Sequence, residues 1–441
     1  MQRAVSHPLS AVAALAALLA VPAAAAPPAD WSAVPAKTVT LFYPGQSSFG
    51  WLRSKAHKGA GLVKTGGACR TCHKADTDAK RGEKIVTGGD LEPAPIPGKK
   101  GAVELAVQAA YDADTLYLRF RWPTQMARPG RMHDYLRFDG ASWAFYGGPR
   151  SKDTVRSGAQ PPLYEDRLAL MIDDGSVDLF AEQGCWLTCH RGMRDMPDAP
   201  SKDTVAAHPR LGKDGLGESD IRKYLPATRG DEAASWDQVR SAEEVAALKA
   251  EGGFLDLMQW RAARSNAVGM ADDGYVLEYR LGDEGKGPFS WNVDRKTMTP
   301  KYMFDAAKVG AKSLTVAEIG DAAKPYAMIR EENAVPYDPG AGWKADDVLP
   351  GRLLSRDDAS GSAADNSAVE GEWSDGTWTV VWARKLDTGH PADDKTLEAG
   401  KVYTFGFAVH DDNVTTRFHF VSFPVTLGLG AKADITAVKL D

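Results

Sequence analysis

The chain has 441 residues and a formal net charge of −6 at pH 7, with 43% hydrophobic and 25% charged residues. This composition is ordinary for a globular protein of one large or two to three smaller domains, and it offers no basic patch that would indicate nucleic-acid binding. Beyond the N-terminus no run of about 18 apolar residues occurs, so we expect no membrane span in the mature chain.

Residues 1–25 have the pattern of a signal peptide. Arg3 supplies the positive start, residues 11–21 are apolar, and Ala23-Ala24-Ala25 offers a small-residue cleavage site. The apolar run is too short to anchor the chain in a bilayer. The sequence therefore predicts export to the periplasm, with Ala26 as the first mature residue.

Residues 26–100 are expected to form an N-terminal unit that carries one haem. Cys69-Arg70-Thr71-Cys72-His73 reads C-x-x-C-H, the attachment signature of a c-type haem. Two thiols bind the porphyrin vinyl groups and the adjacent His binds the iron. A disulfide would leave the His unexplained, and a zinc site would require two distant motifs to converge. We predict a covalent haem c at Cys69, Cys72 and His73.

His57 is the only other His of this unit, and no Met lies between residues 27 and 100. As the sixth iron ligand it would create a bis-His site, and the alternative is a surface His beside Lys58. Residues 51–57 are expected to form a short helix. A Pro-rich stretch at 93–100 is typical of a linker and closes the unit.

Residues 101–441 alternate between apolar and polar side chains in many short runs. Residues 103–111 and 116–122, separated by Asp112-Ala113-Asp114, predict a β-hairpin. Further strands are expected at 167–172, 254–261, 275–281, 377–382, 402–410 and 417–425. Ser241-Ala242-Glu243-Glu244 is a capping box that opens a helix to about Lys249. We predict a mainly β protein, a β-sandwich whose long loops carry function, with helical insertions or an extended lid at 195–241.

A second motif, Cys185-Trp186-Leu187-Thr188-Cys189-His190, reads C-x-x-x-C-H within this region. The four Cys of the chain all lie in these two motifs, and each motif ends in His. One extra residue bulges the loop but still allows two thioethers. We therefore predict a second covalent haem c at Cys185, Cys189 and His190, with Arg191 and Arg194 available for haem propionates or surface partners.

From about residue 100 the chain resembles the haem-binding domain of the ethylbenzene dehydrogenase and dimethylsulfide dehydrogenase gamma subunits. The resemblance lies in residues 111–122 (YDADTLYLRFRW), in Glu165-Asp166-Arg167, and in residues 407–411 (FAVHD) and 420–422 (FVS). It implies a β-sandwich related to carbohydrate-binding modules. It also implies a non-covalent haem b with Met and Lys as axial ligands, the Lys lying just before the last strand. His419 stands about where that Lys would be, and a covalent haem bound by His190 would replace the haem b.

His419 is accordingly the leading candidate for the distal ligand of the second haem, and we expect it on a strand. Met132 and His133, in the loop after the first hairpin, are the second choice. Met193 and Met196 follow His190 too closely to reach the far face of the same haem. The remaining candidates are His410 and Met126, whereas His208 and His390 lie in polar loops and are expected to be exposed.

These features predict a periplasmic di-haem c-type cytochrome that carries electrons rather than an enzyme, because iron with two strong axial ligands has no open position. The expected partners are a membrane quinol-oxidising cytochrome and a soluble oxidoreductase or cytochrome. Two alternatives stay open at this point. One is a haem-bearing subunit of a molybdenum oxidoreductase, and the other is a di-haem reductase or peroxidase with one open iron position.

Overall fold

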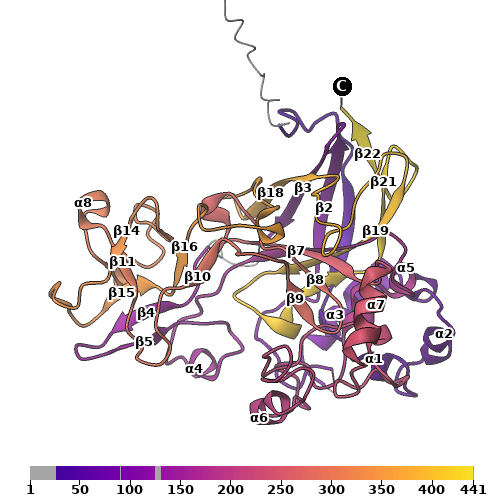
Figure 1. The fold of residues 1–441 in the computed structure, drawn as a ribbon, viewed down its shortest axis with the longest axis horizontal. Coiled ribbons are helices and arrows are strands. Elements are labelled where there is room, and N and C mark those ends of the chain that lie inside the picture. Colours follow the sequence, from indigo (N-terminus) through magenta and orange to yellow (C-terminus); the bar gives the residue numbers. More distant parts are fainter. Residues whose placement is uncertain (1–25, 90, 125–130, 441) are drawn as a thin grey trace, which may run out of the picture.

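The computed structural model describes residues 26–89, 91–124 and 131–440 and is a mainly β protein (Figure 1). The expected signal peptide and Met126 lie outside the described residues. One sheet dominates, in the order β17 (Val369–Ser374), β18 (Thr377–Lys385), β3 (Thr115–Pro123), β2 (Ala102–Tyr111), β1 (Lys37–Phe42), β20 (Phe420–Ser422), β19 (Val402–His410), β6 (Arg167–Asp173), β7 (Leu255–Arg261), β8 (Gly274–Val276) and β9 (Arg280–Gly282). Two more strands, β21 (Val425–Leu429) and β22 (Ile435–Lys439), link β19 to β2.

The two halves of this sheet face each other across one apolar core, which makes the fold a β-sandwich. Alternation along β3 turns Leu118, Phe120 and Trp122 inward, where each is at most 1% exposed. Phe120 meets Phe407 of β19 at 5.8 Å between ring centres, and Trp122 meets Trp260 of β7 at 5.9 Å. Tight aromatic packing between the halves confirms the predicted fold class and gives the loops at its ends a rigid support.

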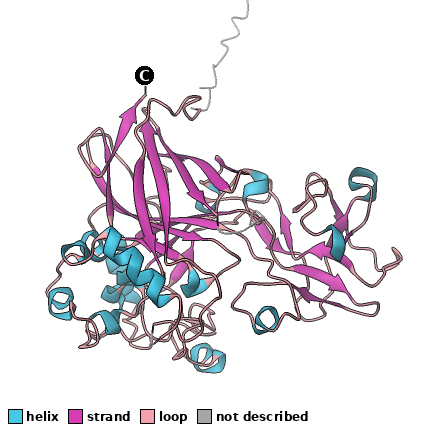
Figure 2. Cartoon of the chain, turned by 180° about the vertical axis from the view of Figure 1, so that it is seen from behind, coloured by secondary structure: helices cyan, strands magenta, loops and turns pink. Residues whose placement is uncertain are grey.

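Smaller sheets build a second lobe (Figures 1 and 2). They are formed by β4 (Tyr135–Phe138), β5 (Trp143–Tyr146), β10 (Phe289–Trp291), β11 (Tyr302–Phe304), β12 (Leu314–Thr315), β13 (Met328–Ile329), β14 (Ala334–Pro336), β15 (Asp347–Pro350) and β16 (Arg352–Leu354). Leu136, Phe304, Met328 and Leu349 are buried in its own core. None of these strands exceeds four residues, so the alternation that predicts a strand is too short to be recognised.

Most of the helices gather at one end of the large sheet, whereas α4 and α8 lie with the second lobe (Figures 1 and 2). The α-helices are α1 (Phe49–Leu52), α2 (Ala60–Lys64), α3 (Ala75–Ile85), α4 (Asp153–Arg156), α5 (Phe180–Gln183), α6 (Lys202–Ala206), α7 (Ala242–Ala250) and α8 (Ala306–Val309). The 3-10 helices are η1 (Cys69–Thr71), η2 (Gly184–Thr188), η3 (Pro226–Thr228), η4 (Asn266–Val268), η5 (Val316–Glu318), η6 (Ser362–Ala364) and η7 (Thr416–Phe418). Within the described ranges, no helix is long and apolar enough to cross a membrane.

Most expected elements are confirmed, and three are corrected. The hairpin and the helix opened by the Ser241 capping box are present, the latter as α7. The run 275–281 is split between β8 and β9, which pair with each other. The run 417–425 is split into η7, β20 and the start of β21, because Pro424 has no N–H to donate to a sheet. The helix expected at 51–57 is only the four residues of α1, and beyond them the chain continues in turns.

The N-terminal segment contributes a strand to the large sheet. β1 pairs with β2 on one side and with β20 on the other, so residues 37–42 form an inner strand of the large sheet. Residues 49–85, including the first Cys motif, then pack as short helices at the same end of the sheet as the second motif (Figure 1). The two motifs, more than a hundred residues apart in sequence, are thus placed at one end of one scaffold.

Candidate functional site

The first motif is folded into a single tight turn. The backbone N–H groups of Cys72 and His73 both donate to the carbonyl of Cys69, at 3.2 and 3.0 Å. This 3-10 turn gathers two thiols and one imidazole within one turn of chain. Cys72 is exposed and Cys69 half-buried, and both are free thiols. Burial raises the pKa of the Cys69 thiol to about 11.

His73 and His57 lie with their imidazole rings close together. Their ring centres are 6.2 Å apart and their planes differ by 21°. The Nδ1 of His73 is 3.0 Å from a carboxylate oxygen of Asp78, and the Nδ1 of His57 is 2.8 Å from the carbonyl oxygen of Leu52. Since both of these oxygens only accept, each Nδ1 carries the proton. Both Nε2 atoms are therefore left with a free lone pair, which is the state in which imidazole binds a metal.

Neighbouring residues pack closely around this His pair. A Cβ added at Gly59 would lie 3.0 Å from Cε1 of His57, so a glycine keeps this contact open. The ring of Trp51 lies 5.3 Å from that of His57. Asp78 sits in the first turn of α3 and also pairs with Arg81, which holds the carboxylate in place against His73. Asp78 was not among the residues expected from the sequence, although an acid in the first turn of a helix that follows the motif is a recognisable signal.

The second motif is buried rather than exposed. Cys185, Cys189 and His190 are each at most 3% exposed. The extra residue between the two Cys is taken up by η2, in which the Thr188 hydroxyl donates to the Cys185 carbonyl at 2.8 Å. A Cβ at Gly406 of β19 would overlap the Cys185 sulfur, so that strand approaches the motif closely only because it has a glycine there.

His190 is oriented differently from His73. Its ring stacks on Tyr224 with centres 3.7 Å apart, and its Nε2 lies 2.9 Å from the Tyr224 carbonyl oxygen. Its Nδ1 is buried without a hydrogen-bond partner among the described residues. Burial, together with Arg229 and Lys223, lowers the His190 pKa to about 3, so the imidazole is neutral. A buried, neutral imidazole with an unpartnered nitrogen is able to bind a metal.

The imidazole ring of His419 stacks on that of His410. Their ring centres are 4.5 Å apart, and their ring planes are nearly parallel. His419 immediately precedes β20 instead of lying within a strand, which corrects the expectation. Its Nδ1 donates to the Thr416 carbonyl, and a Cβ at Gly45 would overlap its ring. The Nε2 of His419 is therefore the nitrogen with a free lone pair, and the backbone of Gly45 packs closely against this side of the ring.

The short segment from Gly45 to Phe49 connects the two buried histidines. Gly45 meets His419, and the Phe49 ring lies 5.8 Å from that of His190. The Phe49 N–H donates to the Cys189 carbonyl at 2.6 Å. Lys223, whose Nζ is 3.1 Å from the Cys189 sulfur, is a charge that lowers the pKa of both histidines. Burial is the main reason that the pKa of His419 falls to about 3.

Phe423 connects the two motifs to each other. Its ring centre is 5.3 Å from that of His73 and 4.9 Å from that of Trp186, which lies between Cys185 and Cys189. A continuous chain of three aromatic rings thus joins His73 of the first motif to the loop of the second. This contact could not be expected from the sequence, because it joins three segments that are distant along the chain.

The other expected ligands are placed elsewhere. Met132 is buried in the core of the second lobe, and the Met193 sulfur accepts a hydrogen bond from the His190 N–H at 3.3 Å. His133 pairs with Asp134 and packs 4.8 Å from the Tyr164 ring. Burial lowers the pKa of His133 to about 4. Arg194, considered for haem propionates, pairs with Asp220 at 3.4 Å.

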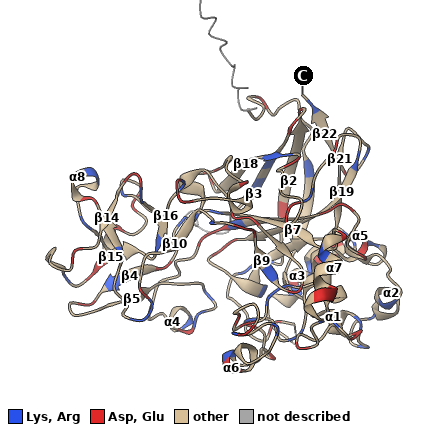
Figure 3. Ribbon diagram, viewed as in Figure 1, with Lys and Arg blue, Asp and Glu red and all other residues tan. Residues whose placement is uncertain are grey.

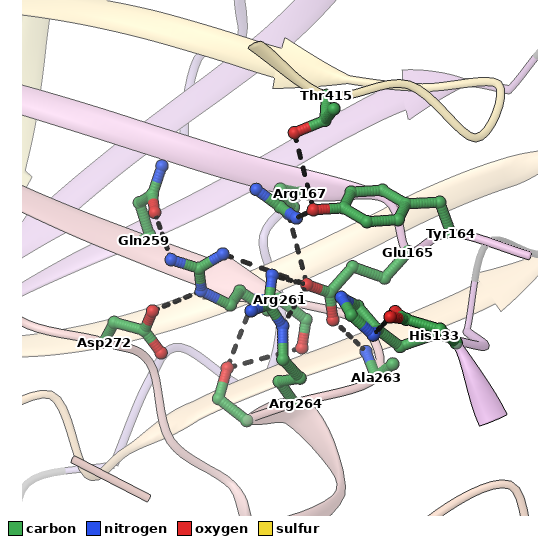
Figure 4. Close-up of polar contacts among 12 residues, drawn as sticks. His133, Tyr164, Glu165, Arg167, Gln259, Arg261, Ala263, Arg264, Asp272 and Thr415 are labelled. Atoms are coloured by element: carbon green, nitrogen blue, oxygen red, sulfur yellow. Dashed lines mark hydrogen bonds and ion pairs between the residues drawn. The ribbon is translucent and has the colours of Figure 1, made fainter. Parts of the chain in front are cut away.

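His133 and Tyr164 border a buried ion network centred on Glu165 (Figure 4). Glu165 accepts from Arg264 at 2.6 Å and from Arg167 at 3.2 Å, and its pKa is lowered because the charges of these arginines outweigh its burial. The network ties the ends of β6 and β7 together. His133, at the border of this network, therefore has a structural role.

The last two histidines are not near either motif's Cys. His390 is exposed, as expected, and pairs with Asp365 at 2.6 Å. His208 is only half-buried, with its Nε2 3.0 Å from the Asp237 carbonyl oxygen. Its Nδ1 accepts from the backbone N–H groups of Arg210 and Leu211, so it closes a loop.

Comparison with known proteins identifies a family and two relatives. Residues 29–422 match the family described as ethylbenzene dehydrogenase. The chain is 30% identical over 421 residues to "Cytochrome c-552" of Stutzerimonas stutzeri, covering 95% of this chain and 93% of that protein. It is 28% identical over 173 residues to "Cytochrome c-551" of Rhodocyclus tenuis, covering 39% of this chain and 60% of that protein. The family match begins at residue 29 and so includes the first motif, whereas the resemblance seen in the sequence began near residue 100.

Proposed function

Because the chain belongs to the ethylbenzene dehydrogenase family, we propose that it is an exported di-haem c-type cytochrome that transfers electrons between redox proteins. The family and the similarity to two cytochromes c support the broader description, a haem-containing electron-transfer protein. The number of haems, their ligands, the periplasmic location and the partners are our proposal.

The observation that carries the proposal is the separation of His57 and His73. A metal–imidazole bond of about 2.0–2.1 Å, with about 1.1 Å from the nitrogen to the ring centre, puts two rings on one metal about 6 Å apart. The two ring centres here are 6.2 Å apart. Each ring is also fixed through Nδ1 by an acceptor, as metal-binding imidazoles commonly are. Cys69 and Cys72 would hold the haem covalently, with His73 and His57 as its axial ligands.

An iron with two imidazole ligands has no open coordination position. Such a group exchanges electrons and does not bind a substrate at the metal. This favours an electron carrier over a reductase or peroxidase, for which one iron would need to be open. His73 held by Asp78, and His57 held by Leu52, also keep the ligand geometry rigid, which limits rearrangement when the oxidation state changes.

For the second haem we propose Cys185 and Cys189 as the covalent attachment and His190 as the proximal ligand. His419 is the proposed distal ligand, because its Nε2 has a free lone pair. The backbone of Gly45 packs against that side of the ring, so the segment around Gly45 would have to shift to admit a haem. In the structure His190 uses Nε2 for the Tyr224 carbonyl, so it would have to turn to bind iron through that atom. The ring chain through Phe423 would bring the two haems close enough for direct electron exchange.

The proposed location rests on the signal-peptide pattern of residues 1–25 and on the motifs. Haem c is attached on the exported side of the bacterial membrane, so a signal peptide and two attachment motifs are mutually consistent. Localisation of the full-length chain by cell fractionation tests this part of the proposal directly.

The surface around the first motif suggests the chemistry of a partner. Between residues 53 and 84 the chain has nine Lys or Arg and three Asp or Glu, and all of the nine except Arg53 are exposed. Elsewhere both signs are intermixed along the ribbon (Figure 3). A positive surface around the exposed Cys72 favours a redox partner with an acidic surface, and its association should slow as the salt concentration rises. A membrane quinol-oxidising cytochrome and a soluble oxidoreductase or cytochrome are the partners that we propose.

A second function is favoured by the family. Its name refers to a dehydrogenase, so this chain could serve as the haem-bearing subunit of a molybdenum oxidoreductase. Co-purification of the chain with a large catalytic subunit would support that role, and a chain that purifies alone and reduces a cytochrome would support the carrier.

Optical and EPR spectra of the purified holoprotein test the proposed function. Low-spin signals from both haems in the oxidised and reduced states, without carbon monoxide binding, are expected for the carrier. A high-spin haem that binds carbon monoxide would contradict it and favour an enzyme.

A further inference from the structure

Away from both Cys motifs, three aspartates from separate segments converge at one point. Asp256 lies on β7, Asp273 directly precedes β8, and Asp394 lies in the loop between β18 and β19. One carboxylate oxygen from each lies within 4.8 Å of the other two. Asp256 is fully buried and Asp394 is 4% exposed. Three carboxylates from distant parts of the chain thus share a small, largely dry space.

The protein satisfies only part of the hydrogen-bonding capacity of this cluster. One oxygen of Asp256 accepts from Arg384 at 2.7 Å, and one oxygen of Asp394 accepts from the Thr388 hydroxyl at 2.7 Å. The Oδ1 atoms of Asp256 and Asp394 are buried and have no hydrogen-bond partner among the described residues. Leaving a buried charged oxygen unpaired is costly, so such atoms in a native structure indicate a missing water or ion.

The charges of the cluster do not balance either. Asp283 adds a fourth carboxylate, while Arg384 is the cation that binds Asp256. The nearby Lys395 turns its ammonium group away, to Asp174 and to the Gly252 carbonyl, each at 2.7 Å. Within the described residues, only Arg384 has a cationic side chain bonded to the cluster directly, so an added cation would find carboxylate oxygens without a cationic partner there.

We propose that Asp256, Asp273 and Asp394 bind one calcium ion. Calcium takes six to eight oxygen ligands at about 2.3–2.6 Å, so two ligands on opposite sides of the ion are about 4.8 Å apart. One oxygen from each of the three aspartates lies within that distance of the other two, so a single ion can contact all three. An all-oxygen set without His or Cys favours calcium or magnesium over zinc. Calcium also tolerates an irregular arrangement of ligands, whereas magnesium demands a nearly octahedral one.

The site has a route for the ion and for water ligands. A cavity of about 380 Å³ is lined by Asp273, Asp283 and Gly274, among others, and so reaches the edge of the cluster. Bound calcium would join β7, the segment before β8 and the β18–β19 loop, which otherwise meet through mutually repelling carboxylates. Its expected effect is a higher melting temperature of the folded protein.

Calorimetric titration of the haem-loaded protein with calcium chloride, after removal of metals with EGTA, tests this site. We expect about one calcium ion per chain, and a melting temperature that rises with about 1 mM calcium and much less with magnesium. Asp394→Asn keeps the acceptor for Thr388 but removes one charge, and Asp273→Asn keeps the acceptor for Asn366. Each should weaken calcium binding at least about tenfold. Asp357→Asn, at an exposed position, is the matched control and should bind as the parent does.

Two results would overturn the proposal. The first is a metal-stripped parent protein that binds no calcium and melts at the same temperature with and without it, a result that does not depend on any variant folding. The second is binding of zinc but not calcium, with loss of zinc binding in His390→Ala. That result would assign the metal to Asp365, His390 and Asp394 instead, which also lie within 4.8 Å of one another.

Discussion

Replacing His57 with Ala should open the iron of the first haem while leaving the second haem unchanged. His57 is the imidazole that faces His73, and no Met lies between residues 27 and 100 to replace it. In the parent protein both axial positions are filled and the haem is low-spin. In the variant one position is empty or holds water, so this haem becomes high-spin and binds carbon monoxide.

The size of the effect follows from the structure. The His57 side chain is half-buried and makes one hydrogen bond, to the Leu52 carbonyl, so its loss should cost about 0.5–1.5 kcal/mol of folding free energy. A protein with an ordinary stability of about 5–15 kcal/mol stays folded after that loss. About half of the haem should change spin state, because one of two haems is affected. His57→Met should keep the haem low-spin and raise its midpoint potential, since thioether ligation raises potentials.

EPR and carbon monoxide difference spectra of the purified holoprotein measure this change. His390→Ala is the matched control, because His390 is exposed and its imidazole is bonded to Asp365. Low-spin spectra that are identical in His57→Ala and in the parent would refute the reasoning. They would mean that the sixth ligand comes from the β-sandwich or that the 6.2 Å separation from His73 has no part in iron binding.

Further variants at three positions test other parts of the arrangement. Asp78→Asn should leave the first haem low-spin but raise its potential, because an amide increases the basicity of His73 less than a carboxylate does; a potentiometric titration with no shift would contradict this. His419→Ala should open the second iron to carbon monoxide and His419→Met should raise its potential, whereas parental spectra in both would contradict His419 as the ligand, with His390→Ala as the control. Glu165→Gln should lower the free energy of unfolding by about 3–5 kcal/mol, because Arg167 and Arg264 lose their buried partner; urea denaturation that shows no loss would contradict it. Since folding lowers the pKa of Glu165, its contribution is complete above the unfolded pKa of about 4.3 and declines as the pH falls below it, so the variant should lose less stability in acid than the parent does.

Sequence patterns that span a few neighbouring residues predicted the elements of the fold that are defined by such short segments. The alternation in residues 116–122 identified the hairpin, and the capping box at Ser241 identified α7. The two Cys motifs are also local, because the thiols and the imidazole must reach one porphyrin. The second lobe was missed because its strands are two to four residues long and derive their stability from packing between distant segments.

The contacts that define the candidate site are mostly long-range, which is why sequence reasoning found the histidines but not their surroundings. His57 could be proposed by elimination, since it is the sole further His in its unit. The glycines that make room, Gly45 for His419 and Gly406 for Cys185, are over two hundred residues from the groups they face. Their importance lies in the absence of a Cβ at a close approach, which no spacing in the sequence reveals. The same holds for Phe423, which contacts both motifs only after folding.

The intact mass of the denatured, exported protein tests the central claim most directly. Because all four Cys lie in two attachment motifs, the mass should equal that of the polypeptide plus two haem groups. Cys185→Ala combined with Cys189→Ala should reduce it to one haem, held at Cys69 and Cys72. A parent protein with a single covalent haem would contradict attachment at the second motif, and one with no covalent haem would contradict the proposed function as a whole.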